Sequence, residues 1–95
     1  MELRIDSAAD QSIIAALRNG ERREAAGLMV RYYANAVLNL CAAQVEELER
    51  AEDLTHECFR QAFATMDAFG GELSVRNWLV YTSRQVCLEQ LQREA

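Results

Sequence analysis

The stretch "AEDLTHECFRQAFATM", residues 51–66, decides the fold that we expect. Its apolar residues recur at spacings of three and four, which is the period of a helix with one buried face. That face consists of Ala51, Leu54, Cys58, Ala62, Phe63 and Met66. The opposite face carries Asp53, His56, Glu57 and Arg60. The sequence therefore places the charges on the outside of a helix that belongs to a hydrophobic core.

Two segments before this stretch have the same helical period. Ile13, Ile14 and Leu17 predict a short helix in residues 11–18, which Ser7 or Asp10 caps and "NG" at 19 and 20 ends. A second, longer helix is expected from near Glu21. Its predicted inward stripe consists of Ala25, Leu28, Met29, Tyr32, Ala36, Val37 and Leu40.

A fourth helix follows the turn residues "FGGE" at 69–72, which we expect to end the third helix. Ser74 is its predicted cap. The expected inward residues are Val75, Trp78, Leu79, Thr82, Val86 and Leu91, and the expected outward residues are Asn77, Tyr81, Arg84, Gln85 and Leu88. No stretch alternates as a half-buried strand does, so we expect an all-α, compact four-helix bundle.

The chain has 95 residues, which we expect to form one domain over 1–95, with residues 1–9 allowed as a loose N-terminal segment. Its net charge of −5 comes from residues 44–57, which hold six acids and Arg50 as the one base, while the rest holds nine of each sign. Two interpretations stay open. The acids belong to a solvated helix start, where they interact well with the helix dipole, or they form a face for a basic partner.

The sequence gives little support for an enzyme or a metal centre. Cys41, Cys58 and Cys87 are widely spaced in apolar patterns, so we expect reduced core residues, not a zinc site or a disulfide. His56 with Glu52 or Asp53 could be half of a metal site, but the chain has no second histidine. On a helix His56 and Cys58 point about 200° apart, which disfavours a nucleophile and base pair. We expect no enzyme, no cofactor and no metal.

The sequence shows neither a leader peptide nor an apolar run long enough for a membrane span, so we expect a cytoplasmic protein. All ten cationic residues are arginines. Tyr81 lies between Arg76 and Arg84 with Asn77 and Gln85 nearby, a set that could stack unpaired bases and contact phosphates. The alternative is that codon bias produced an arginine-only set and that these residues are the polar side of an amphipathic helix.

Three blocks taken in order resemble region 2 of the bacterial sigma-70 family, in its extracytoplasmic-function (ECF) group. They are "RAEDLTHECFRQAF" at 50–63, "FGGELSVRNWL" at 69–79 and "WLVYTSRQVCLEQL" at 78–91. The earlier "IIAALRNGERREAAGLMVRYYANAV" at 13–37 resembles the segment that opens the same domain. The likeness covers residues 10–92.

The resemblance implies a transcription initiation module that binds the β′ clamp helices of core RNA polymerase and recognises and melts the promoter −10 element. By position it makes Asp53, His56, Glu57 and Arg60 the polymerase-binding face. It makes the loop from Phe69 through Gly70, Gly71 and Glu72 to Ser74 the pocket for a flipped base. The non-template single strand would contact Asn77, Tyr81, Arg84, Gln85 and Leu88. An anti-sigma factor is a further implied partner.

The sequence departs from the family pattern at several positions. His56 and Gln85 stand where glutamine and asparagine are common, Gly70 stands where a basic residue is common, and "LEQLQREA" lacks the usual basic run. Fewer cations imply a weaker and less salt-sensitive grip on DNA. The second hypothesis is therefore a sigma-like protein-interaction domain, a decoy or an anti-sigma docking surface, without promoter recognition. The chain is too short for the family's second helical domain, so it is an excised fragment or a free-standing domain.

Overall fold

The computed structural model describes residues 7–69 and 74–94. These residues form four α-helices and one short 3₁₀-helix: α1 (Ser7–Arg18), α2 (Arg22–Ala42), α3 (Leu48–Ala64), η2 (Met66–Ala68) and α4 (Val75–Glu94). Within this part of the chain there is no β-strand. The expected all-α, four-helix architecture is confirmed. None of the described helices is long and apolar enough to cross a membrane.

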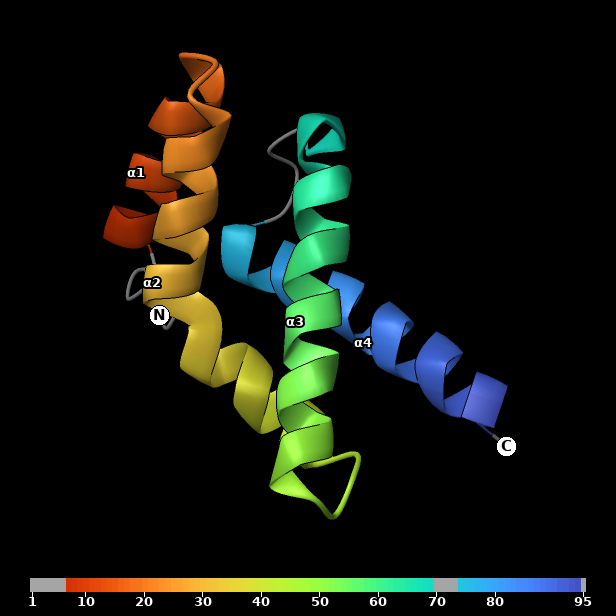
Figure 1. Ribbon diagram of the computed structural model, residues 1–95. Coiled ribbons are helices and arrows are strands. Elements are labelled where there is room, and N and C mark those ends of the chain that lie inside the picture. The colour runs from red at the N-terminus through yellow and green to blue at the C-terminus, as the bar shows by residue number, and fades with distance from the viewer. Residues whose placement is uncertain (1–6, 70–73, 95) are drawn as a thin grey trace.

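Helices α1, α2 and α3 pack side by side, each antiparallel to the next one along the chain, and α4 crosses them. In Figure 1, α1 lies against α2, α2 runs antiparallel to α3, and α4 crosses behind α3. Helix α4 also contacts α2 and α1. The hydrophobic core therefore lies between α4 and the layer made by the other helices.

The turn between α1 and α2 depends on Gly20. Its φ is +74°, a left-handed conformation that glycine adopts at little cost because it has no Cβ atom. The Gly20 N–H donates to Leu17 O at 3.1 Å, and the Glu21 N–H donates to Ala16 O at 2.9 Å. These bonds satisfy the last carbonyls of α1. The predicted stop at Asn19 and Gly20 is confirmed.

The structure excludes Asp10, one of the two predicted caps of α1. Helix α1 begins at Ser7, so Asp10 lies inside it and does not cap it. The Asp10 side chain is buried, with 7% exposed, and it accepts two hydrogen bonds from other helices. Tyr33 Oη donates to Asp10 Oδ1 at 2.6 Å, and the Val75 N–H donates to Asp10 Oδ2 at 2.9 Å. Asp10 thus serves the N-terminus of α4, where N–H groups lack partners within the helix.

Ser74 completes the N-terminus of α4. Its Oγ accepts a hydrogen bond from the Asn77 N–H at 3.0 Å, and its backbone carbonyl accepts one from the Trp78 N–H at 2.9 Å. This is the geometry of a serine N-cap. The predicted cap is confirmed, and Ser74 and Asp10 together satisfy N–H groups of the first turn.

The buried stripe of α2 is narrower than predicted. It consists of residues spaced by four: Ala25, Met29, Tyr33, Val37 and Cys41. Tyr32 and Ala36 were expected to face inward but are exposed, Tyr32 by 50%, and Leu28 and Leu40 are only half-buried. The hydrophobic period does not predict which of the two adjacent tyrosines is buried. Tyr33 is the buried one, because its hydroxyl finds a hydrogen-bond partner in the Asp10 carboxylate.

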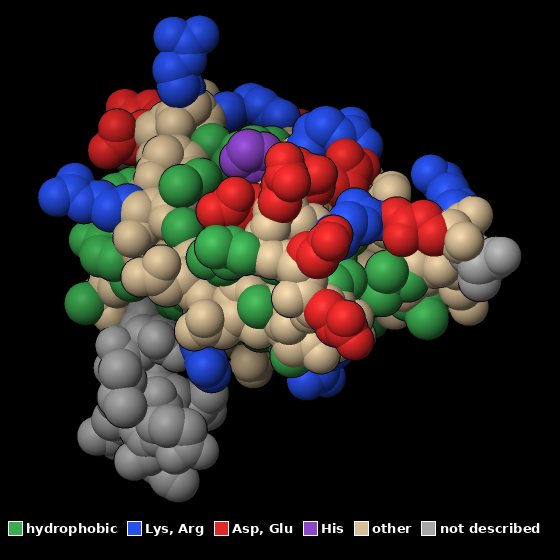
Figure 2. Space-filling view, turned by 60° about the horizontal axis from the view of Figure 1, so that its bottom comes forward, with side chains coloured by type: hydrophobic (Ala, Val, Ile, Leu, Met, Phe, Trp, Pro, Cys, Tyr) green, Lys and Arg blue, Asp and Glu red, His purple; other side chains and the backbone are tan. Residues whose placement is uncertain are grey.

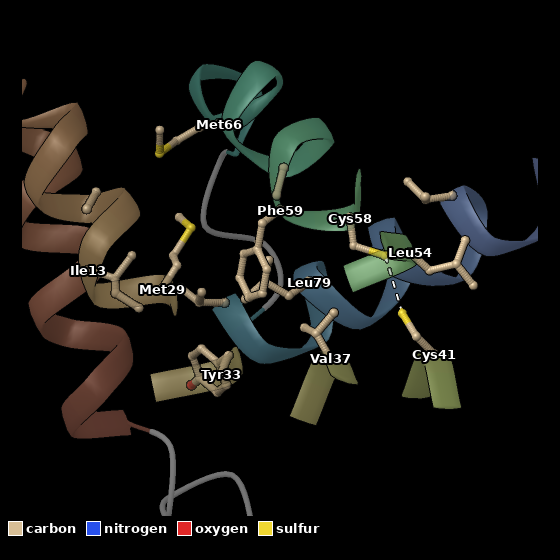
Figure 3. Close-up of a cluster of buried hydrophobic side chains, with 14 of the residues drawn as sticks. Ile13, Met29, Tyr33, Val37, Cys41, Leu54, Cys58, Phe59, Met66 and Leu79 are labelled. Carbon is tan, nitrogen blue, oxygen red and sulfur yellow. Dashed lines mark hydrogen bonds between the residues drawn. The ribbon is translucent and has the colours of Figure 1, made fainter. Parts of the chain in front are cut away.

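Helix α3 presents its predicted apolar face to the core. Ala51, Leu54, Cys58 and Ala62 are buried, and so is Phe59, which the pattern did not place there. Figure 3 shows Leu54, Cys58 and Phe59 pointing toward residues of α2 and α4. Met66 is buried from η2, while Phe63 is half-buried. Helix α3 ends at Ala64, before the glycines that were expected to end it, and Gly70 and Gly71 lie outside the described residues.

Two ion pairs join helix ends that are distant in the sequence. Arg22, at the start of α2, pairs with Asp67 of η2 and donates to the Phe63 carbonyl at 3.2 Å. Arg50, in the first turn of α3, pairs with Glu94 at the end of α4. The Arg22–Asp67 pair is exposed, and such pairs contribute little to stability, about 0–1 kcal/mol.

We predict that Asp10→Ala destabilises the domain by about 2–3 kcal/mol, because it leaves the Tyr33 hydroxyl and the Val75 N–H buried without this acceptor. Tyr33→Phe removes one of the two bonds and should cost about 1 kcal/mol. Urea unfolding followed by circular dichroism measures both changes. Asp67→Ala, at an 80% exposed side chain, is the matched control. A loss for Asp10→Ala no larger than that of the control would contradict the assignment.

Candidate functional site

The outer side of α3 carries the polar surface that the sequence predicted. We call Asp53, His56, Glu57 and Arg60 the acidic face. Asp53, His56 and Arg60 are exposed, and the Glu57 side chain is 30% exposed. In Figure 2 acidic side chains gather around the histidine, with hydrophobic side chains beside them. The predicted division between charged outside and apolar inside of α3 is confirmed.

Glu57 and Arg60 form an ion pair along α3. Arg60 Nε donates to Glu57 Oε1 at 3.0 Å. This hydrogen bond is the main reason that the pKa of Glu57 is lowered from its ordinary value, and the positive charge of Arg60 acts in the same direction. Glu57 is therefore ionised at neutral pH. The exposed Glu46, Glu47, Glu49 and Glu52 extend the negative charge toward the start of α3.

An apolar hollow of about 500 Å³ adjoins the acidic face between α2 and α3. Its lining is Val30, Ala34, Thr55, His56, Phe59, Arg60 and Phe63. The sequence analysis did not predict that Val30 and Ala34 of α2 belong to this surface. Val30 is 40% exposed. The pattern that could have indicated it is a valine and an alanine four residues apart, just outside the predicted buried stripe of this helix. Two members of the acidic face, His56 and Arg60, thus take part in lining an apolar depression.

The outer side of α4 carries the second predicted surface. We call Asn77, Tyr81, Arg84, Gln85 and Leu88 the α4 face. All five are exposed, Tyr81 by 61% and Leu88 by 53%. Val75, Leu79, Thr82 and Val86 are buried on the other side, as expected, while Trp78 and Leu91 are half-buried.

Two hollows border the α4 face. One, of about 350 Å³, lies between α3 and α4 and is lined by Gln61, Thr65, Trp78, Tyr81, Thr82, Gln85, Val86 and Glu89. The other, of about 450 Å³, is lined by Gln44, Arg84, Gln85, Cys87, Leu88, Leu91 and Gln92. The sequence missed Gln61 and Thr65, because only the packing of α3 on α4 brings them beside Tyr81. Tyr81 and Gln85 are thus flanked by recesses, not by a flat surface.

The predicted base-binding loop is described only at its ends. Phe69 is half-buried, and its ring centroid lies 5.3 Å from that of Trp78 at an interplanar angle of 49°. Such tilted packing is favourable for aromatic pairs. Gly70, Gly71 and Glu72 lie outside the described residues. The rings of Phe69 and Trp78 therefore form a packed aromatic pair beside the α4 face.

The three cysteines are free, and all three are buried, as the apolar pattern around them predicted. Spacing did not predict that they meet: Cys41 Sγ lies 3.7 Å from both Cys58 Sγ and Cys87 Sγ. The hydrogen bond with Cys58 lowers the pKa of Cys41 to about 6, against the opposing effect of burial. Burial and the neighbouring Cys41 raise the pKa of Cys87 to about 11. We call this group the thiol cluster.

The structure separates the residues that could have formed a catalytic pair. Cys58 lies in the core, with 1% exposed, while His56 is exposed on the outer side of the same helix. Within residues 7–69 and 74–94, His56 belongs to no group of three side chains able to hold a metal. The expected divergence of these two side chains is confirmed.

Comparison with known families shows the family to which this chain belongs. A sequence profile described as "Sigma-70 region 2" matches residues 29–95, so the chain belongs to the sigma-70 region 2 family. This family consists of transcription initiation factors and not of enzymes. The match includes α3, α4 and both faces, whereas α1 and the first residues of α2 lie before it.

A curated relative supports the same assignment. The RNA polymerase sigma-H factor of Pseudomonas aeruginosa is 29% identical over 70 residues, which cover 74% of this chain and 36% of that protein. The chain thus spans about a third of this relative's length. No solved structure matches the chain.

We predict that Arg60→Gln raises the pKa of Glu57 toward its ordinary value, because the mutation removes the main hydrogen bond to the carboxylate. In the parent chain the folded-state pKa of Glu57 is depressed. Its contribution to stability is therefore present above the unfolded-state pKa and is lost as the pH falls through the folded-state pKa. An NMR titration of the Glu57 side-chain carboxyl carbon measures the shift. Arg31→Gln, on α2, serves as control, and an unchanged Glu57 titration in Arg60→Gln would contradict the prediction.

Proposed function

We propose that this chain is the transcription initiation module of an ECF-type sigma factor. The acidic face docks on the β′ clamp helices of core RNA polymerase, and the α4 face holds the non-template single strand of the promoter −10 element. The supporting observation is that two differently composed outward surfaces, on α3 and α4, lie within the residues that match sigma-70 region 2.

The surface around the acidic face has the composition of a protein-binding site. Val30, Phe59 and Phe63 supply an apolar depression, and His56 and Arg60 of the acidic face also line it. Apolar centres with polar rims are the usual anatomy of protein interfaces. The acids along α3 would steer a basic partner and fix its orientation more than they would add affinity.

The α4 face has the composition of a single-strand binding site. Tyr81 is exposed enough to stack on an unpaired base, and Arg84 follows it by three residues on the same helix side. The hollow between Tyr81 and Gln61 offers amide groups that can bond to base edges. We place the flipped base beside Phe69 and assign Gly70, Gly71 and Glu72, which lie outside the described residues, to the same site.

This function also supplies the remaining assignments that we propose. Residues 1–95 act as one domain, and an anti-sigma factor is a further partner that would cover one of the two faces. Polymerase and promoter both lie inside the bacterial cell, so we place the protein in the cytoplasm. Docking and strand binding need no cofactor.

One observation favours the alternative of a protein-interaction domain without promoter recognition. Glu89 lines the same hollow as Tyr81 and Gln85, and a carboxylate there repels phosphate. In this alternative the acidic face still binds polymerase, while the α4 face binds a regulatory protein. The two functions therefore differ in whether the domain has any affinity for a DNA strand.

We predict that Asp53→Arg with Glu57→Arg weakens binding to core polymerase at least tenfold, because it places repulsive charge on the proposed interface. Binding is measured by fluorescence titration of labelled domain, and circular dichroism verifies that the variant remains helical. Glu21→Arg with Glu24→Arg makes the same change in net charge at the start of α2 and should bind nearly as the parent does. Equal losses for both variants would show a general charge effect and contradict the assigned face.

We predict that Tyr81→Ala weakens the binding of a −10 non-template oligonucleotide, in the presence of polymerase, by about 1–3 kcal/mol, or roughly five- to 150-fold. Arg84→Ala should weaken it less and reduce its salt dependence. Arg31→Ala is the control for a lost arginine elsewhere. If the parent domain with polymerase has no strand affinity at low salt, the protein-interaction alternative is correct.

A further inference from the structure

The thiol cluster brings together all three cysteines of the chain from three helices. Cys41 belongs to α2, Cys58 to α3 and Cys87 to α4, and they are 0%, 1% and 2% exposed. Their sulfur atoms all lie within 4.8 Å of one another. Figure 3 shows the Cys41 and Cys58 side chains pointing toward each other across the core. Neither proposed face uses these residues.

The sulfur positions fit the coordination shell of a metal ion. Thiolate sulfur binds zinc-like ions at about 2.3 Å, so two such ligands at a tetrahedral or trigonal angle are about 3.8–4.0 Å apart. Two of the sulfur pairs are already separated by 3.7 Å. An ion could enter after sulfur movements of only a few tenths of an ångström.

The surroundings of the cluster favour a soft ion with few ligands. Thiolates select soft cations such as Cu(I), and the burial of all three sulfurs leaves little room for coordinating water. Ser83 adds a polar group one turn before Cys87 on α4. Its hydroxyl is buried without a hydrogen-bond partner in the described structure, and its backbone carbonyl oxygen lies 3.8 Å from Cys58 Sγ.

One side of the cluster borders a surface hollow. Cys87 lines the hollow of about 450 Å³ on α4, together with Gln44, Leu88 and Gln92. An ion could approach Cys87 from this hollow and reach Cys41 and Cys58 behind it. A metal site needs such an entry path as well as its ligands.

We propose that the thiol cluster binds one soft, thiophilic metal ion through Cys41, Cys58 and Cys87, and that Cu(I) is the ion it suits best. Metal–sulfur bonds replace the S–H bonds, and the protons leave to the solvent. The bound ion joins α2, α3 and α4, the helices that carry or support both faces. Binding therefore stabilises the folded domain, because the unfolded chain does not hold the three sulfurs together.

Anaerobic titration of the reduced, metal-free full chain with Cu(I) tests the proposal. We expect one ion per chain by native mass spectrometry, a melting temperature raised by about 5 °C or more, and three sulfur ligands by X-ray absorption. Cd(II) serves as a second probe, because its thiolate bonds give a charge-transfer band in the ultraviolet. Zn(II) should bind more weakly, since it prefers four ligands.

Three single variants, Cys41→Ala, Cys58→Ala and Cys87→Ala, should each lose most of the affinity, at least a hundredfold. Glu46→Gln with Glu47→Gln, at exposed acids, should keep it and controls for binding at surface carboxylates. Absence of a one-to-one complex in the parent chain would overturn the proposal, and this result does not depend on any variant folding. So would Cu(I) binding that persists in all three cysteine variants. A reduced chain that retains no metal but forms a disulfide on mild oxidation would identify a thiol pair instead.

Discussion

The arrangement of the domain depends on a buried carboxylate. A charge inside a protein is costly unless hydrogen bonds satisfy it, and Asp10 accepts one from the Tyr33 hydroxyl and one from the Val75 N–H. These bonds join α1, α2 and the N-terminus of α4. Helix α1 precedes the residues that match the family profile, so Asp10 connects α1 to the matched part of the chain.

The packing of α3 and α4 in the bundle makes both proposed surfaces rigid. The acidic face and the α4 face lie on regular helices whose opposite sides are buried, so their side chains keep fixed spacings. The hollows beside them arise where two helices meet. Val30 of α2 and Phe59 of α3 line one hollow, and Gln61 of α3 and Tyr81 of α4 line another. Recognition in each case would combine one helix face with the edge of its neighbour.

The features that depend on one helix alone could be predicted from the sequence. The outward positions of α3 and α4, the Ser74 cap and the Gly20 turn follow from period and local chemistry, and they are confirmed. Contacts between helices were not predictable in the same way. The choice of Tyr33 over Tyr32, the burial of Phe59 and the role of Asp10 depend on partners that are distant in the sequence. The cysteines show the same limit. Each was correctly predicted to be a core residue, but the contact between their sulfur atoms could be seen only in the folded structure.

The bond from Asp10 to Val75 spans 65 positions, whereas neighbouring helices of this bundle are joined by short connections. Helical domains with mostly local contacts fold rapidly, in microseconds to milliseconds. During synthesis α1 and α2 leave the ribosome before α4. The Asp10 side chain therefore obtains its Val75 N–H donor only after α4 has been made. Asp10 therefore has both of its hydrogen-bond donors only once α1, α2 and α4 have packed together.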